Sequence, residues 1–460
     1  MLFNSLAFGV FALIFFAGWP LAKRRPVIRW AYITLFSLVF YGWWDWRFLF
    51  LLLFSGGLDY AAALGMAAYP RYRKGLLGIS LAGNLGALAI FKYSGWAADT
   101  LEQVLGWSGL SVELSSRIPA FMLILPAGIS FYTFQSLSYT LDVYHGRLKP
   151  VRNIWHFFAF LSLFPQLVAG PILRAQDILD QLRAQPSTRE ADRWAGLVRI
   201  VQGLFKKMVI ADNLAPFVQA GFGTAAVPDS ALYAWVLAIA FGFQIYYDFG
   251  GYSDIALGLL RWMGYQVPDN FRQPYLASSL RDFWARWHIS LSTWFRDYVY
   301  IPLGGNQHHL YRNLWITMVL SGIWHGAAWH FVVWGGWHAL CLSVERWLRL
   351  PVRMGRWGFL LTLPVVWIGW VLFRAPTLSD AGRMLLRIFT PGSGWPGLDM
   401  NITIYLLLAA GLELWYAVPG VVHKLQGPRW QYAGPWLVAL VFALTMFFRG
   451  PGAEFIYFQF

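Results

Sequence analysis

The sequence has 460 residues, of which 58% are hydrophobic, 19% are aromatic and 13% are charged. A chain this apolar cannot build a water-exposed surface, which excludes a soluble globular protein and indicates an all-α polytopic membrane protein. The net charge of +14 does not indicate nucleic-acid binding, because the Lys and Arg residues lie in short clusters beside apolar segments, as the positive-inside pattern requires. The single cysteine, Cys341, argues against a disulfide framework or a thiolate zinc site.

Apolar segments long enough to cross a bilayer follow one another along the chain. We expect spans at residues 2–21, 30–54, 76–93, 119–142, 153–173, 196–220, 229–249, 313–345, 357–373, 402–421 and 432–449. The segment 313–345 is expected to be a break plus a helix, and two shorter segments, 56–68 and 251–266, to be partial or re-entrant. Because no linker or shift in composition separates these segments, we expect one transmembrane domain over residues 1–460.

Basic clusters predict which ends of the spans face the cytoplasm. The clusters lie at residues 23–29, 71–74, 147–152, 346–356 and 424–429. Three expected spans, 357–373, 402–421 and 432–449, follow the cytoplasmic cluster 346–356. Because three crossings end on the opposite side, the C-terminal end is expected on the non-cytoplasmic side. The segment 153–173 joins two basic stretches, so the pattern leaves open whether it crosses the membrane or re-enters.

The least membrane-like stretch between spans is 268–312, which combines several charged residues with many aromatic ones. Residues 279–299 are expected to form a helix that begins at Ser279 as its N-cap. Asp282 and Arg286 are spaced as an i,i+4 ion pair. His288 lies beside the apolar stripe of this helix, which we expect to line a cavity.

The next segment, "LSGIWHGAAWHFVVWGGWHAL" (320–340), carries three histidines. His325 is the candidate general base, because a neutral imidazole can remain at membrane depth and still move protons near neutral pH. Gly322, Gly335 and Gly336 would let backbones or a ligand approach closely. His330 and His338 are interpreted as packed structural residues. No metal site is expected here, because no Glu follows His325 and no carboxylate lies nearby in the segment.

Other catalytic templates do not occur. The sequence contains no G-x-S-x-G nucleophile elbow and no P-loop. A histidine acting on a pre-activated acyl thioester remains possible. The sequence ends with "FIYFQF" (455–460), which could be an interfacial aromatic belt or could tuck into the protein.

Six segments together resemble the membrane-bound O-acyltransferase family, in the bacterial branch that O-acetylates alginate and related polysaccharides. They are "LPAGISFYTFQSLSYTLDVYHG" (125–146), "FPQLVAGPILR" (164–174), "KKMVIADNLA" (206–215), "YYDFGGYSDIALGL" (246–259), "NFRQPYLASSLRDFWARWHISLSTWFRDYVYIPLGGN" (270–306) and "GIWHGAAWHFVVWGGWH" (322–338). The resemblance runs nearly from end to end and implies a ring of about 11 transmembrane helices, with further embedded helices, around a central tunnel.

The resemblance also implies functional residues. The family's active-site histidine stands in a W-H-G motif, here His325, and a second functional histidine stands in W-H-I-S, here His288. The C-terminal motif resembles that of the small membrane partner of the D-alanine exporting acyltransferase, in which a tyrosine is proposed to carry the acyl group. The corresponding residue is Tyr457, here fused to the enzyme.

The expected function is an acetyltransferase of the bacterial inner membrane that moves acetyl from a cytoplasmic donor, expected to be acetyl-CoA, onto an extracytoplasmic glycan. The acceptor is expected to be an exopolysaccharide such as alginate or cellulose, or peptidoglycan, with a periplasmic SGNH-hydrolase-like partner completing the transfer. No permanently bound cofactor and no metal are expected. The alternatives are a transporter or channel without chemistry and a lipid-directed acyltransferase of the same fold.

Two further groups of residues are candidates for the site. Asp248, Tyr252 and Asp254 are expected to line the tunnel, although Gly250 and Gly251 beside them could mark only a break in a helix. The expected contacts to the CoA phosphates are Arg281, Arg286, Lys206 and Lys207. Basic residues at membrane interfaces also set topology alone.

Overall fold

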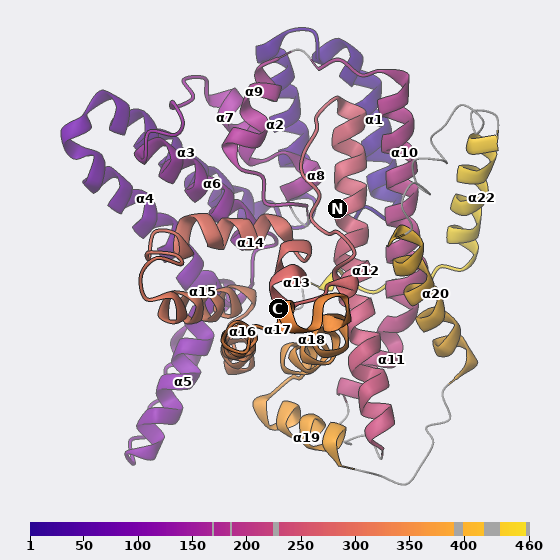
Figure 1. Cartoon of the computed structure of the whole chain (residues 1–460). Coiled ribbons are helices and arrows are strands. Elements are labelled where there is room, and N and C mark those ends of the chain that lie inside the picture. Colours follow the sequence, from indigo (N-terminus) through magenta and orange to yellow (C-terminus); the bar gives the residue numbers. More distant parts are fainter. Residues whose placement is uncertain (168–169, 185, 224–229, 391–398, 418–432, 457–460) are drawn as a thin grey trace. The chain divides into compact units, whose positions relative to one another are not determined.

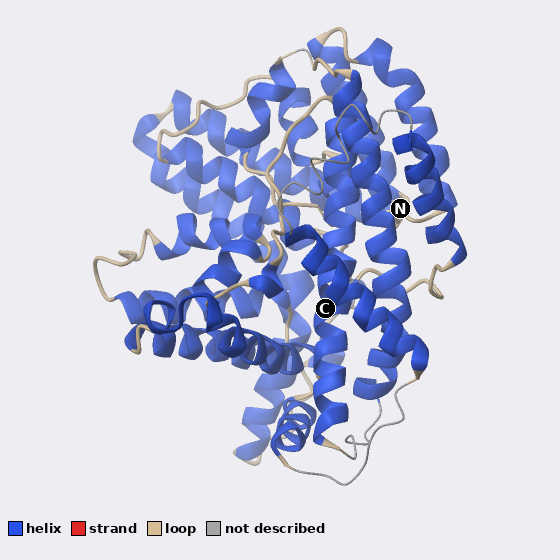
Figure 2. Cartoon of the chain, turned by 45° about the vertical axis from the view of Figure 1, so that its right-hand side comes forward, coloured by secondary structure: helices blue, strands red, loops and turns tan. Residues whose placement is uncertain are grey.

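The computed structural model shows a chain of α-helices joined by loops and by short 3₁₀ or π turns (Figures 1 and 2). It describes residues 1–167, 170–184, 186–223, 230–390, 399–417 and 433–456. These ranges contain no β-strand, so the predicted all-α class is confirmed for the described chain. They divide into two compact units, one of residues 1–196 with 259–267 and one of residues 197–258 with 268–460. The expectation of one domain stays a prediction.

The first unit holds the N-terminal helices. They are α1 (Leu6–Ala22), α2 (Pro26–Gly42), α3 (Leu49–Ala68), α4 (Arg73–Leu88), α5 (Ser94–Trp107), α6 (Ile129–Tyr144), α7 (Ile154–Leu161), α8 (Phe164–Leu167) and α9 (Ala175–Arg183).

The predicted span 30–54 is wrong, and the segment 153–173, for which the sequence left crossing or re-entry open, forms short helices. The segment 30–54 is not one helix, because the Asp45 side chain accepts a hydrogen bond from the Arg47 amide at 3.0 Å and starts a short 3₁₀ turn between α2 and α3. The segment 153–173 contains α7 and α8, of eight and four residues. At 1.5 Å per residue, α7 is about 12 Å long, so neither helix alone can cross a hydrocarbon core of about 30 Å.

The second unit holds the remaining helices and every predicted site residue that the structure describes. The helices are α10 (Glu190–Phe205, which begins in the first unit), the π turn η6 (Lys206–Ala211), α11 (Asp212–Gly223), α12 (Ala231–Met263, which ends in the first unit), α13 (Leu280–Arg286), α14 (Ile289–Phe295), the π turn η8 (Arg296–Tyr300), α15 (Leu310–His325), α16 (Trp329–Trp347), α17 (Leu350–Met354), α18 (Phe359–Arg374), α19 (Leu378–Phe389), α20 (Met400–Ala417) and α22 (Ala433–Phe447). The predicted break within 313–345 is confirmed by the loop between α15 and α16.

The two adjacent glycines of α12 do not break the helix. Gly250 and Gly251 lie inside its 33 residues, so the predicted division of this region into 229–249 and 251–266 is wrong. Gly251 instead permits close packing, because a Cβ atom there would lie 2.7 Å from the carbonyl oxygen of Gly203. The backbones of α10 and α12 therefore touch one turn away from Lys207.

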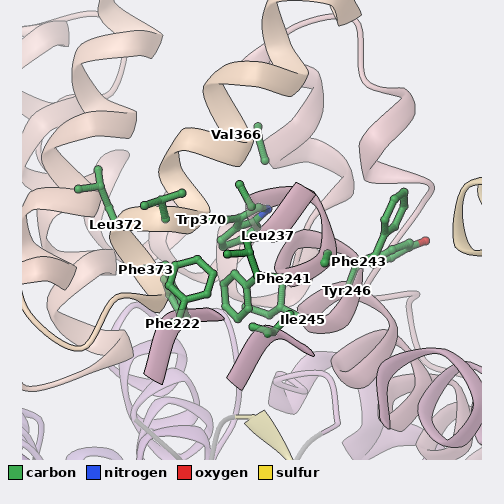
Figure 3. Close-up of a cluster of buried hydrophobic side chains, with 14 of the residues drawn as sticks. Phe222, Leu237, Phe241, Phe243, Ile245, Tyr246, Val366, Trp370, Leu372 and Phe373 are labelled. Atoms are coloured by element: carbon green, nitrogen blue, oxygen red, sulfur yellow. The ribbon is translucent and has the colours of Figure 1, made fainter. Parts of the chain in front are cut away.

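An aromatic core holds the second unit together (Figure 3). The Phe241 ring of α12 lies 6.4 Å from the rings of Trp370 and Phe373 on α18, and these two rings lie 5.6 Å apart, edge to face. Such pairs contribute about 0.5–1.5 kcal/mol each beyond the burial of their area. The core thereby fixes α18 beside the C-terminal end of α15, where His325 lies.

Three helical stretches in the described chain are long and apolar enough to cross a membrane. They are Trp46–Ala68, Pro70–Trp107 and Ala231–Met263. Five further apolar helices are shorter, including α1, α2 and α18. The chain is a helical membrane protein, and these lengths do not confirm a ring of about 11 spans.

Candidate active site

His325 is the last residue of α15, and the packing of α15 against α16 fixes its place (Figure 1). A Cβ atom on Gly335 would lie 2.5 Å from the carbonyl oxygen of Met318, and one on Gly322 would overlap the carbonyl of Phe331. Gly336 faces only Trp315, at an ordinary contact distance of 3.8 Å. The predicted close approach of backbones is therefore confirmed at Gly322 and Gly335 and does not extend to Gly336.

The His325 ring lies in a box of aromatic rings. Its centroid is 4.9 Å from that of Trp324 and 5.1 Å from those of both Trp334 and Phe373, all in edge-to-face orientation. The side chain is buried. A neutral imidazole is the form that can act as a general base.

His288 occupies a break between two short helices, so the predicted single helix over 279–299 is wrong. The predicted start of the helix is confirmed. The Ser279 hydroxyl accepts a hydrogen bond from the Asp282 amide at 3.0 Å, and Asp282 forms an ion pair with Arg286 at 2.7 Å. Helix α13 then ends, and His288 adopts the left-handed conformation at φ 42° and ψ 54°. A non-glycine residue holds this conformation only where its surroundings enforce it.

Asn270 enforces that conformation. Its side-chain oxygen accepts hydrogen bonds from the Ser290 amide at 3.2 Å and the Ser290 hydroxyl at 2.9 Å, and its backbone oxygen accepts from the Ile289 amide at 2.9 Å. The same side-chain oxygen lies 3.3 Å from Nδ1 of His288. Sequence reasoning did not single out Asn270, although it lies in one of the motifs that carry the family resemblance.

The tautomer of His288 follows from these contacts. An amide N–H can only donate, so the Asn270 atom that faces Ser290 is an acceptor, and Nδ1 of His288 must carry a proton toward it. Burial lowers the pKa of His288 to about 3, and the ring is therefore neutral at pH 7. The acceptor nitrogen of the ring is Nε2.

A series of ring contacts joins the two predicted histidines to the C-terminal segment. Trp324 lies 4.9 Å from His325 and 6.0 Å from His288. On the other side of His288, the Phe249 ring is 4.7 Å from the imidazole and 5.9 Å from the Phe455 ring. The structure therefore brings His288, His325 and Phe455 into one aromatic cluster.

The described part of the C-terminal motif packs inside the second unit. Phe455 and Ile456 are buried, and Phe455 also lies 4.5 Å from the ring of Tyr252. Of the two readings left open by the sequence, the structure supports the tucked-in one for these two residues. Tyr457 lies outside the described residues, and its predicted role as an acyl relay stays a prediction.

The two candidate lysines pair with different carboxylates, two of them on α12 and one, Asp212, at the start of α11. Lys207 is buried and forms ion pairs with Asp212 at 2.7 Å and Asp248 at 2.6 Å. Lys206 pairs with Asp254 at 2.6 Å. Asp212 is a further member of this site that sequence reasoning missed, although it follows Lys207 in the "KKMVIADNLA" motif.

The ion pair between Lys206 and Asp254 extends into a network. Asp254 also accepts a hydrogen bond from Arg199 at 2.9 Å, and Arg199 in turn pairs with Asp269 at 2.6 Å. Two other residues were expected to contact the phosphates of acetyl-CoA. Arg281 is exposed at the start of α13, and Arg286 is half-buried. The expected phosphate contacts and the expected tunnel lining by Asp248, Tyr252 and Asp254 stay predictions.

His330 and His338 are both packed in the interior, and their predicted structural role stays a prediction. Nδ1 of His330 lies 3.1 Å from the carbonyl oxygen of Leu372. His338 is buried between the rings of Trp284 and Trp334, at 5.1 and 4.9 Å.

Comparison with known proteins gives a consistent result. The profile of "MBOAT, membrane-bound O-acyltransferase family" matches residues 150–378. The chain is 41% identical over 419 residues to a probable alginate O-acetylase of Pseudomonas putida, covering 87% of this chain and 82% of that protein. It is 34% identical over 427 residues to the peptidoglycan O-acetyltransferase of Helicobacter pylori, covering 84% and 79% respectively.

A more distant similarity covers part of the chain. The teichoic acid D-alanyltransferase of Streptococcus thermophilus is 29% identical over 238 residues, which is 48% of this chain and 57% of that protein.

Proposed function

Because the chain belongs to the membrane-bound O-acyltransferase family and is an O-acyltransferase, we propose that it moves acetyl from cytoplasmic acetyl-CoA to a polysaccharide outside the inner membrane. The names of two relatives, an alginate O-acetylase and a peptidoglycan O-acetyltransferase, support both the acetyl group and the polysaccharide acceptor. An exopolysaccharide such as alginate or cellulose is the favoured acceptor, with peptidoglycan as the other candidate.

The observation that carries this proposal is the aromatic cluster that joins His325, His288 and Phe455. Two imidazoles lie on either side of Trp324, and the residue that precedes Tyr457 by two positions packs one ring away from His288. An acceptor group delivered by the C-terminal segment would therefore enter surroundings that already contain a base. Exclusion of water from such a site also protects an activated ester.

The proposed reaction has two steps. In the first, His325 removes the proton of the Tyr457 phenol, and the phenolate oxygen attacks the thioester carbonyl of acetyl-CoA. The C–S bond breaks, and the proton passes from His325 to the CoA thiolate. In the second, a hydroxyl of the acceptor attacks the ester carbonyl on Tyr457, the bond from that carbonyl to the phenolic oxygen breaks, and the hydroxyl proton passes to the released phenolate, which regenerates the phenol.

The energetics suit a relay of this kind. A phenol, with a pKa of about 10, is a better leaving group than a sugar hydroxyl, so onward transfer from Tyr457 runs downhill. General-base assistance of about 10²–10⁴-fold is sufficient because the thioester is already activated. His288 supplies a second neutral ring whose acceptor nitrogen Nε2 is fixed by Asn270.

The remaining parts of the proposal concern donor, topology and partner. Arg281 and Arg286 would contact the CoA phosphates, since a guanidinium binds phosphate oxygens in a bidentate manner. The C-terminal segment would lie toward the periplasm, inside a family-type ring of helices. An SGNH-hydrolase-like periplasmic protein would complete transfer to the sugar.

The test is polysaccharide acetylation in cells that carry His325→Ala or Tyr457→Phe in place of the wild-type chain. The phenylalanine variant keeps the ring and removes only the acceptor oxygen. We expect both variants to lose acetylation while the protein remains in the membrane at wild-type amounts. Normal acetylation with Tyr457→Phe would end the relay, and normal acetylation with His325→Ala would end the assignment of the base.

A further inference from the structure

The buried ion group of Lys207, Asp212 and Asp248 has no part in the proposed transfer. We call these three residues the Lys207 clamp. One ammonium faces two carboxylates, at 2.7 and 2.6 Å, and all three side chains are at most 3% exposed. With both carboxylates ionised, the three side chains carry a net charge of −1, and a buried charge of this kind requires further partners.

The C-terminal segment supplies those partners through its backbone. The Ile456 amide donates to Asp248 at 2.7 Å, and the Ala453 amide donates to Asp212 at 3.4 Å. Lys207 donates to the carbonyl of Ala453 at 2.9 Å. Hydrogen bonds to ionised groups are stronger than those between neutral groups. The ion group is therefore electrostatically complete only when the segment is in place.

The preceding residues follow the same surface. The Gly450 amide donates to the carbonyl of Met208 at 2.8 Å, and the Asn213 side chain donates to the carbonyl of Phe448 at 3.0 Å. A Cβ atom on Gly450 would lie 2.6 Å from the backbone of Asp212. Gly452 then turns the chain at a φ of 81°. The segment 448–456 thus lies along η6 and the start of α11, held mainly through backbone atoms.

We infer that the Lys207 clamp is a docking site for the chain's own segment 450–456 and sets the register in which Tyr457 is presented to His325 and His288. The inference rests on the proposed function for the role of Tyr457. The three residues act as positioning residues: they bind the backbone that precedes the reactive tyrosine. Because Asp248 binds the amide of Ile456, the register is fixed one residue before Tyr457.

The test combines two readouts on the full-length protein in detergent. The first is the rate at which carboxypeptidase removes residues 455–456, followed by intact mass. The second is the acetyl occupancy of Tyr457 after incubation with acetyl-CoA. We expect Lys207→Met and Asp248→Asn to speed removal at least tenfold and to lower acetyl occupancy at least tenfold. The matched control for removal is Asp254→Asn, which breaks the neighbouring ion pair on the same helix and should leave removal as slow as in the wild type.

A second pair of variants leaves the helices untouched. Ile456→Pro deletes the amide that Asp248 accepts, whereas Ile456→Val keeps it together with most of the buried side chain. We expect fast removal for the proline variant and wild-type behaviour for the valine variant. This pair decides the question even if the variants of the ion group fail to fold.

The outcomes distinguish a failure of the Lys207 clamp from a failure of Tyr457 as the acyl carrier. Removal that stays slow in Ile456→Pro and in Asp248→Asn would overturn the clamp, even with Tyr457 acetylated in the wild type. Full acetyl occupancy in a variant whose segment is released would overturn its positioning role. Absence of acetyl from wild-type Tyr457 would instead count against the proposed function, and the carboxypeptidase rates, which need no acetyl-CoA, would still decide whether the clamp holds the segment.

Discussion

The amide of Ile456 donates a 2.7 Å hydrogen bond to the buried carboxylate of Asp248, which lies 208 residues earlier in the chain. This contact holds the C-terminal segment against α12. The Phe249 ring, directly after Asp248, contacts both His288 and Phe455. One turn of α12 thus carries both the anchor of the C-terminal segment and its link to the candidate base residues.

Replacement of the candidate base should abolish transfer and preserve the fold. We expect His325→Ala to lower the rate of acetyl transfer about 10²–10⁴-fold, because the general base is lost. His325→Gln keeps a polar side chain of similar size inside the aromatic box and should be equally inactive. Donor turnover and the thermal midpoint of the purified protein are the measurements. A transfer rate within threefold of the wild type for either variant would remove His325 from the chemistry.

The backbone of His288 allows its ring to be tested separately from its conformation. Asn tolerates the left-handed region better than most other residues. We therefore expect His288→Asn to keep the wild-type thermal midpoint and to lose activity, whereas His288→Ala should lose both. An active His288→Asn variant would show that this position is needed only for its backbone.

Asn270 should be required for the same site although it is not proposed to touch the substrate. Asn270→Ala leaves the Ser290 amide and Nδ1 of His288 without the acceptor they share in the wild type. An unsatisfied buried donor costs about 1–3 kcal/mol, so the thermal midpoint should fall together with activity. Asn270→Asp keeps the acceptor oxygen and should recover more of the midpoint than alanine does. Equal midpoints for all three proteins would contradict the account of the His288 conformation.

The glycines between α15 and α16 provide a matched pair. Gly335→Ala places a methyl group 2.5 Å from the carbonyl oxygen of Met318 and should destabilise the protein by about 1–3 kcal/mol through overpacking. Gly336→Ala meets nothing closer than 3.8 Å and should be nearly neutral. Thermal unfolding in detergent measures both variants. Equal stability changes in the two variants would contradict close packing as the reason for Gly335, because alanine is the better helix former at both positions.

The proposed contacts of Arg281 and Arg286 with acetyl-CoA predict a change in the KM for this substrate. The double variant Arg281→Ala/Arg286→Ala should raise the KM for acetyl-CoA roughly 10-fold, since charge-assisted contacts to phosphate would be lost. Removal of Arg286 alone also breaks its pair with Asp282, and Asp282→Ala is therefore the control for that effect. An unchanged KM would leave these arginines with a role in topology only.

Local signals in the sequence predicted several features correctly. The N-cap at Ser279, the Asp282–Arg286 pair and the break between α15 and α16 depend on residues close together in the chain, and each is confirmed. The W-H-G and W-H-I-S motifs led to His325 and His288, which lie in one aromatic cluster.

Features that depend on distant contacts were missed or wrong. The helix over 279–299 breaks at His288 because Asn270 binds the chain there, 18 residues earlier. Gly250 and Gly251 looked like a break, yet Gly251 serves the packing of α12 against Gly203. The carbonyl of Ala453, which accepts a hydrogen bond from Lys207, lies about half of the chain away. No local pattern in the sequence can reveal such a pairing.

Mass spectrometry of the C-terminal peptide tests the central claim most directly. The purified protein would be incubated with acetyl-CoA, with His325→Ala and Tyr457→Phe treated in parallel. We expect an acetyl group on Tyr457 in the wild type and no acetylated peptide in either variant. A fully covered wild-type peptide without acetyl, while donor turnover continues, would contradict the relay and would point to direct transfer onto the partner or the glycan.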